Sequence, residues 1–243
     1  MWCFYKGSMK ISFNNISFGW NIYTHMAETK KALDGFNCLS AKEKDMLGHI
    51  SQLPDLEKES TQDFGSAHFF DVLNKDPSFG TKNDEINNAM SRFLAHSEKA
   101  LQETKREDFL REIGYAAHYL QDAATPPHVE NGNYLHKLYR LPMHLMFERG
   151  PKHGAKGKTD SILKNYIPTD TSFVSLKQLF HDTANFAVQK ENKIEYNNIK
   201  KWFGIQQKCI NRSVDATRSY FDYMLKFLPK NTQAKTICAK VRI

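Results

Sequence analysis

The segment from about residue 106 to 124 constrains the fold most, because both sides of one predicted helix carry information. Apolar residues recur along one side at three- and four-residue spacing: Phe109, Ile113, Ala116, Ala117 and Leu120. His118 and Asp122 lie four residues apart on the opposite side, where a surface helix would carry Lys and Glu. Pro126 and Pro127 end the helix. This pattern predicts an interior helix with core on one side and a polar site on the other.

The rest of the chain also reads as helix. Helices are predicted at residues 21–35, 40–51, 84–104, 142–149, 172–190 and 197–228. Ser40 and Glu43 form a capping-box signature for the second of these. The third has an inner stripe at Ile86, Met90, Phe93, Leu94, Ser97 and Leu101. Residues 52–82 read as mostly loop, and no strand-like alternation of useful length occurs. The prediction is a single all-α, multi-helix domain.

Composition agrees with a packed helical domain and excludes some alternatives. The chain has 243 residues, of which 40% are hydrophobic, with only 12 Gly and 8 Pro. No apolar run approaches the roughly 20 residues of a membrane span. Cys3, Cys38, Cys209 and Cys238 form no CxxC pair, which excludes a thiolate zinc site and permits disulfides. The net charge of +7 fits an anionic partner, such as a phospholipid surface or nucleic acid, or a solvated basic surface.

A second helical pair repeats the spacing of the first. His144 and Glu148 also lie four residues apart. Two helices that each present an imidazole and a carboxylate are a common way to build a metal site in a bundle. Neutral imidazole and carboxylate suit Zn²⁺, with Fe or Mn as weaker options. Each pair alone is typical of a surface hydrogen bond, and His25 or His68 alone of a packed histidine; the ordered set favours metal binding.

With these residues in place, the chain resembles the zinc-dependent phospholipase C family, which shares its fold with the S1/P1-type single-strand nucleases. The similarity spans roughly residues 20–228. It is carried by Trp20 and His25, Asp55 in LPDLE, HFFD at 68–71, HxxxDxxxxxH at 118–128 and HxxxE at 144–148. The resemblance implies a mostly helical domain of the phospholipase C/P1 nuclease type, and direct attack by water on a phosphodiester.

The resemblance also implies a role for each of these residues, with up to three zinc ions. One ion would be held by His68, His118 and Asp122. Asp122 would bridge to a second, which would also bind His25 and the backbone amino and carbonyl groups of Trp20. The third would be held by His128, His144 and Glu148. Asp55 would be the base that orients or deprotonates the attacking water, and Phe64, offset from the family position near His68, is the candidate substrate-binding residue.

Two interpretations of the substrate class remain open. Glu148 as the last ligand and the short gap from His128 to His144 favour a phospholipase C that acts at a membrane surface. The five-residue spacing of Trp20 and His25 is that of the nucleases, so nucleic acid is the alternative substrate. Leu56 stands where an aromatic is typical of a choline pocket, and the C-terminal lipid-binding β-sandwich of the large clostridial toxins of this family is not expected here.

Two further alternatives are a non-catalytic metal-binding or membrane-associating domain, and a basic nucleic-acid-binding helical module. No basic groove studded with aromatics supports the last of these.

Whether residues 1–19 are removed decides the expected number of zinc ions and the expected cellular location of the protein. Residues 1–19 precede Trp20 as an extension or leader without a clean apolar region, and residues 229–243 form a basic tail. Removal of residues 1–19 would free the Trp20 amino group and give a secreted, three-zinc enzyme. Their retention would leave one or two zinc ions in an intracellular, for example cytoplasmic, relative. A monomer is expected in either case.

Overall fold

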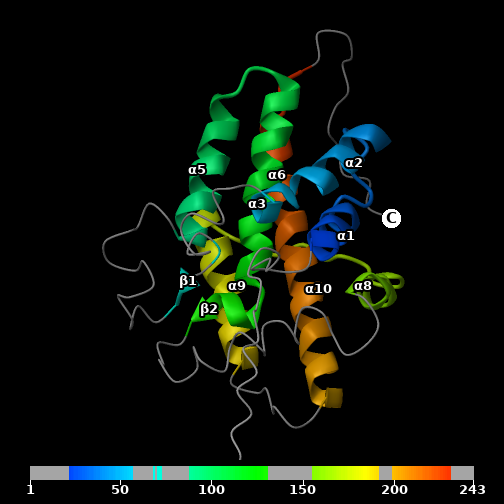
Figure 1. Cartoon of the computed structure of the whole chain (residues 1–243). Coiled ribbons are helices and arrows are strands. Elements are labelled where there is room, and N and C mark those ends of the chain that lie inside the picture. The colour runs from blue at the N-terminus through cyan, green and yellow to red at the C-terminus, as the bar shows by residue number, and fades with distance from the viewer. Residues whose placement is uncertain are drawn as a thin grey trace, which may run out of the picture.

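The computed structural model describes residues 22–56, 68, 70–72, 88–130, 155–191 and 199–230. Over these residues the chain forms one all-helical domain, as predicted (Figure 1). The helices are α1 (Ile22–Ala32), α2 (Ala41–Ile50), α3 (Leu53–Leu56), α5 (Ala89–Gln102), α6 (Arg106–Ala123), α8 (Ala155–Leu163), α9 (Leu176–Glu191) and α10 (Ile199–Met224). Residues 1–19 and 231–243, and the predicted helix at 142–149, lie outside the described residues.

Helix α6 stands in the middle of the bundle, between α5 and α9 on one side and α1 and α10 on the other (Figure 1). Its predicted apolar stripe is fully buried. The opposite side is buried as well, since His118, Gln121 and Asp122 are each 0% exposed. The prediction that both sides of this helix are engaged is therefore confirmed. A helix buried all round fixes its polar side chains among neighbouring elements rather than in water.

Helix α2 approaches α6 closely, and a glycine permits the approach. The predicted capping box is present, with the Ser40 side chain accepting from the Glu43 N–H and the Glu43 carboxylate accepting from the Ser40 N–H. A Cβ at Gly114 of α6 would lie only 2.6 Å from Cγ2 of Ile50, the last residue of α2. The absence of that Cβ brings the end of α2 against the turn of α6 that precedes His118.

Several helix limits differ from the predictions. Helix α5 begins at Ala89, where the Asn88 side chain accepts from the Ser91 N–H, and residues 84–87 lie outside the described residues. Leu101, predicted to face inward, is 46% exposed because it lies in the last turn of α5, beside the bend into α6. Helix α9 begins later than predicted, and α10 ends at Met224 in a short 3₁₀ turn. Helix α8 was not predicted, because its sequence AKGKTDSIL has little apolar periodicity.

Two short strands join segments that are distant in sequence. Strands β1 (Phe70–Asp71) and β2 (Val129–Glu130) are parallel, with Phe70 opposite Val129. They form a ladder too short to show as a sequence pattern, and they hold the segment after His68 beside the segment after His128. No helix in the described part of the chain combines the length and the apolar character needed to cross a membrane.

Candidate metal centre

Six of the predicted site residues meet in the interior of the bundle. His25 comes from α1, Asp55 from α3, and His118 and Asp122 from α6. His68 precedes β1, and His128 ends the 3₁₀ turn Pro126–His128. Their side chains are at most 1% exposed. The other four predicted residues lie outside the described residues: Trp20, Phe64, His144 and Glu148.

The tightest group of donor atoms surrounds one oxygen of Asp122. Asp122 Oδ2 lies 2.8 Å from His68 Nδ1 and 3.2 Å from His118 Nε2. The two imidazole nitrogens are 3.0 Å apart. Neighbouring ligands of a tetrahedral zinc are separated by about 3.3 Å, as follows from zinc–ligand bonds of about 2.0–2.1 Å. The three atoms are thus already near the spacing that one metal ion would require.

The other oxygen of Asp122 turns toward a second group. Asp122 Oδ1 lies 3.5 Å from His25 Nε2 and 3.8 Å from His128 Nδ1. Asp122 Oδ1 and His25 Nε2 are both buried and have no hydrogen-bond partner in the part of the chain that the structure describes. Buried polar atoms are normally satisfied, and a metal ion bound by this carboxylate oxygen and imidazole nitrogen would satisfy both atoms. One carboxylate therefore serves two neighbouring positions.

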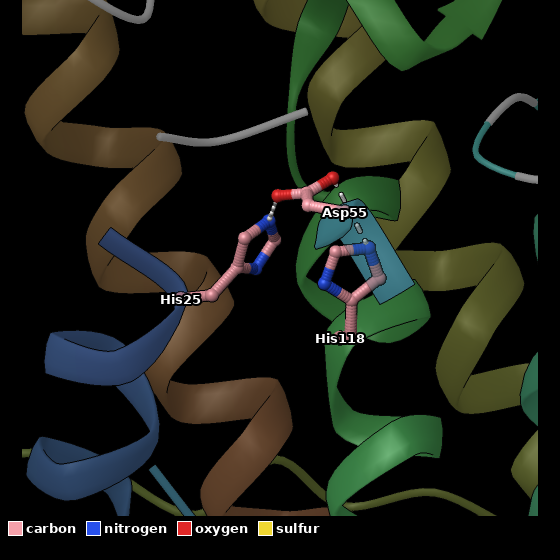
Figure 2. Close-up of side chains that lie close together, drawn as sticks. All are labelled: His25, Asp55 and His118. Carbon is pink, nitrogen blue, oxygen red and sulfur yellow. Dashed lines mark ion pairs between the residues drawn. The ribbon is translucent and has the colours of Figure 1, made fainter. Parts of the chain in front are cut away.

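Asp55 lies between the imidazoles of His25 on α1 and His118 on α6 (Figure 2). Its Oδ2 is 3.7 Å from His25 Nε2, and its Oδ1 is 3.8 Å from His118 Nε2. The same Oδ1 is 3.9 Å from His68 Nδ1. The carboxyl group is fully buried, while the next residue, Leu56, is 60% exposed. Of the two site carboxylates, Asp55 is therefore the one with an exposed neighbour in sequence, whereas both neighbours of Asp122 are buried.

Three imidazoles are held by hydrogen bonds from Nδ1 to oxygens outside the two site carboxylates, Asp55 and Asp122. His118 Nδ1 donates to the Ser51 carbonyl at 2.9 Å, and His128 Nδ1 donates to the His68 carbonyl at 2.9 Å. His25 Nδ1 lies 2.7 Å from the amide oxygen of Gln121. Because carbonyl oxygens only accept, each neutral ring carries its proton on Nδ1 and its lone pair on Nε2. This is the arrangement typical of metal-ligating histidines.

The titration of these groups favours metal binding over ion pairing. Burial, followed by the proximity of His118, holds the pKa of His25 well below its usual value. Burial likewise lowers the pKa of His68. Burial alone would raise the pKa of Asp122, but His118 and His128 lower it, and the net pKa is well below its usual value. Neutral His25 and His68 beside a charged Asp122 are protonation states that metal binding requires.

The donor set fits zinc. Imidazole nitrogens and carboxylate oxygens are ordinary zinc ligands, and His68, His118 and Asp122 supply three of them at close spacing. His25, Asp55 and His118 form a second group of compatible donors. Sequence reasoning identified all six residues but missed Ser51 and Gln121, which orient the imidazoles. No sequence signal pointed to Ser51 or Gln121, because each is recognised only by its contact with a distant imidazole.

No protein-family model matches this chain, and no curated protein matches it in sequence. Solved structures do match it. Alpha toxin from Clostridium absonum aligns with a TM-score of 0.65 at 14% identity, over 88% of this chain and 68% of the toxin. Alpha-toxin of Clostridium perfringens from an avian strain aligns with a TM-score of 0.59 at 18% identity, over 90% of this chain and 67% of the toxin. The helical fold around this candidate metal centre is thus the fold of these clostridial alpha-toxins over most of the chain.

Proposed function

We propose that the protein is a zinc-dependent phosphodiester hydrolase, a phospholipase C that cleaves phospholipid to diacylglycerol and a phosphorylated head group. The observation that carries this proposal is Asp122, whose two oxygens face different imidazoles at 2.8 Å and 3.5 Å. A carboxylate in that position can hold two metal ions side by side, the arrangement that suits phosphodiester hydrolysis. The clostridial fold and the motifs shared with zinc-dependent phospholipases C support the same function.

The residues that would hold zinc follow from the neighbours of the two Asp122 oxygens. His68, His118 and Asp122 would bind one ion, and Asp122 with His25 a second, together with Trp20. His128 would bind a third with His144 and Glu148. Bound zinc would supply the positive charge that neutralises the phosphodiester and lowers the pKa of the attacking water. The interior position of the donors strengthens these electrostatic interactions, because little water screens them.

Asp55 is assigned to the attacking water. Its oxygens lie 3.7–3.9 Å from the ring nitrogens of His25, His68 and His118, somewhat farther than the oxygens of Asp122. A water placed among those nitrogens would lie within hydrogen-bond reach of this carboxylate. Asp55 would orient the water and accept its proton as the new phosphorus–oxygen bond forms.

The replacement Asp55→Asn tests this role. It keeps the size and removes the basic oxygen, so we expect hydrolysis to fall by at least about 100-fold, the lower end of what general base catalysis contributes. The zinc content of the purified variant should stay equal to that of the wild type. Unchanged turnover would refute the role, and a parallel loss of zinc would make Asp55 a ligand instead.

The substrate class is tested on phosphatidylcholine vesicles, sphingomyelin vesicles and single-stranded DNA in parallel assays of the same preparation. Release of phosphorylated head group from vesicles supports the phospholipase. Cleavage of DNA alone would favour the nuclease alternative, which rests on the five-residue spacing of Trp20 and His25. Asp122→Asn serves as the inactive control for all three substrates. Zinc binding without hydrolysis of any of them would leave a non-catalytic metal-binding domain.

Export is part of the proposal, with removal of residues 1–19 and a phospholipid surface as the partner. The intact mass of the mature protein, measured together with its zinc content, tests both. A mass that begins at Trp20 with three zinc ions supports the secreted enzyme. A mass that retains residues 1–19 with one or two zinc ions contradicts it.

A further inference from the structure

The amide of Gln121 occupies an unusual position for a neutral polar side chain. It is 0% exposed, on the turn of α6 that carries Asp122. Its oxygen lies 2.7 Å from His25 Nδ1, and its nitrogen donates to Thr29 Oγ1 at 2.8 Å. Burying an amide is unfavourable unless both ends are hydrogen-bonded. Both ends of Gln121 are satisfied by residues of α1, so the side chain joins α6 to the helix that carries His25.

The orientation of this amide determines which nitrogen of His25 carries the proton. Since the amide NH₂ group donates to Thr29, the amide oxygen faces His25 and accepts from Nδ1–H. The Nε2 lone pair then points toward Asp122 Oδ1 and Asp55 Oδ2, at 3.5 Å and 3.7 Å. A proton on Nε2 would find neither oxygen within hydrogen-bond length. The amide therefore presents His25 with a lone pair aimed between two carboxylates.

The anchor of His25 differs in kind from the anchors of the other imidazoles. His118 and His128 are held by main-chain carbonyls, those of Ser51 and His68. His25 alone among these three is held by a side chain, and a side chain can be removed by mutation. The same turn of α6 also carries Asp122, whose Oδ1 faces His25 Nε2. One turn of α6 therefore holds both the residue that orients His25 and the carboxylate oxygen opposite its ring.

We propose that Gln121 is a positioning residue that sets the tautomer and orientation of His25 for metal binding through Nε2. This rests on the proposed zinc-dependent function and adds a residue to it. The second metal position is organised from within the bundle by Gln121 and Thr29. Its affinity depends on these two side chains as well as on the ligands. Gln121 itself contacts neither metal nor substrate.

The test compares Gln121→Met, which has a similar size but no strong acceptor, with Gln121→Glu, which retains the accepting oxygen. Zn²⁺ affinity is measured by competition with a chromophoric chelator, and the site is followed through the absorption spectrum of bound Co²⁺. In Gln121→Met we expect the affinity for one bound ion to fall by about 10- to 100-fold, the usual effect of losing a hydrogen-bond partner of a ligating histidine. The ion held by His68, His118 and Asp122 should keep its affinity. Gln121→Glu should restore binding of the weakened ion and its Co²⁺ spectrum.

Two further variants separate positioning from packing. Gln206→Met removes another buried glutamine, from α10, and should leave both affinities unchanged. Thr29→Val removes the group that orients the amide and should weaken the same ion as Gln121→Met, to a smaller extent. It also tests the proposal should Gln121→Met fail to fold.

The possible outcomes distinguish the two proposals. If the wild type binds no Zn²⁺, the proposed function fails and this inference fails with it. If the wild type binds two or more ions and Gln121→Met binds them equally well, only the role of Gln121 is overturned. Equal losses in Gln121→Met and Gln121→Glu would also overturn it, because only Gln121→Glu keeps an accepting oxygen, and that oxygen would then make no difference to binding.

Discussion

Helix α6 carries two buried carboxylates that contact histidines, and among the described residues only one of the two also has Lys and Arg partners. Glu112 accepts from His96 Nδ1 at 2.7 Å and from Lys99 Nζ at 2.9 Å, with Arg111 Nε at 3.8 Å. Asp122, ten residues later, has only histidines as ionic partners among the residues that the structure describes. Both carboxylates are almost completely buried.

The two carboxylates differ in how their charge is balanced. Glu112 is neutralised by permanent cations of the chain, and His96 in turn stacks on Tyr115 with ring centroids 5.1 Å apart. Nothing further is needed to stabilise it. Asp122 has no Lys or Arg partner among the described residues, and burial favours the neutral form of two of its histidine neighbours, His25 and His68. The shortest histidine–carboxylate distances are similar in the two clusters, 2.7 Å and 2.8 Å, and the balance of charge separates them.

Metal removal should separate the two clusters most strongly. Zinc at about a thousand times its Kd would stabilise the fold by about 4 kcal/mol per ion. For a chain of this size we therefore expect excess chelator to lower the Tm by about 10 °C. Calorimetric scans of the wild type with and without chelator measure this effect. Glu112→Gln should keep the full chelator response and Asp122→Asn should lose most of it. The reverse pattern would overturn the comparison.

The next largest effect is expected at the cluster around Glu112. Glu112→Gln removes charged hydrogen bonds from a buried position, which should lower the free energy of unfolding by about 2 kcal/mol near neutral pH. Burial would raise the pKa of Glu112, but hydrogen bonds from His96 and Lys99 lower it overall. A depressed carboxyl pKa stabilises the fold above the unfolded value of 4.5, and this stabilisation is lost as the pH falls through the folded value.

Urea unfolding of the wild type and of Glu112→Gln at several pH values measures that dependence. The gap between the two proteins should be constant from about pH 6 upward and should close on acidification below the unfolded pKa of 4.5. A gap that persists in acid would show that the loss of stability comes from packing rather than from charge.

A smaller loss of stability, accompanied by a change at the cluster around Asp122, is expected from Gly114→Ala. The new Cβ would meet Ile50 at 2.6 Å, so α2 must shift and the Ser51 carbonyl must move away from His118. Overpacking of about 2 kcal/mol, offset by about 1 kcal/mol of helix propensity, leaves a net loss of about 1 kcal/mol. Zinc affinity should fall as well. Gly204→Ala, with no atom within 4 Å of the added Cβ, should instead be stabilising. Unchanged zinc affinity in Gly114→Ala would show that the position of α2 does not affect metal binding.

The smallest effect is expected from Lys99→Met. Lys99 is 58% exposed, so its ion pair with Glu112 is partly screened by water. The free energy of unfolding should fall by less than about 1 kcal/mol, as for other exposed pairs. Chemical denaturation in low and high salt measures this difference, and zinc affinity serves as the unaffected reference. A loss as large as that of Glu112→Gln would mean that Lys99 alone neutralises the cluster.

The sequence predicted those parts of the fold that depend on local order. The capping box at Ser40 and Glu43 and the apolar stripe of α6 were found at their predicted places. Five ligand candidates and the predicted base Asp55 also meet, because His118 and Asp122 lie one turn apart and the proline pair ends α6 before His128. The exposure of Leu101 was not foreseen, because it depends on where α5 gives way to α6 rather than on spacing.

Contacts between distant segments could not be read from local patterns. Helix α8 is joined to α1 through polar pairs such as Thr24 with Thr159 and Tyr23 with Asp160, which leave no apolar stripe. The bond between His25 and Gln121 joins residues 96 positions apart. No periodicity marks Gln121 as different from a surface glutamine. Only the packing of α1 against α6 gives it a partner.

The Ser51 carbonyl that orients His118 has a consequence for how such a protein changes over time. Every amino acid carries a main-chain carbonyl, so replacement of the Ser51 side chain leaves this support in place as long as α2 ends at the same residue. The His68 carbonyl supports His128 in the same way. Selection on these supports acts on the path of the backbone rather than on the identity of a side chain. Lineages can therefore preserve the geometry of the centre while the residues around it diverge.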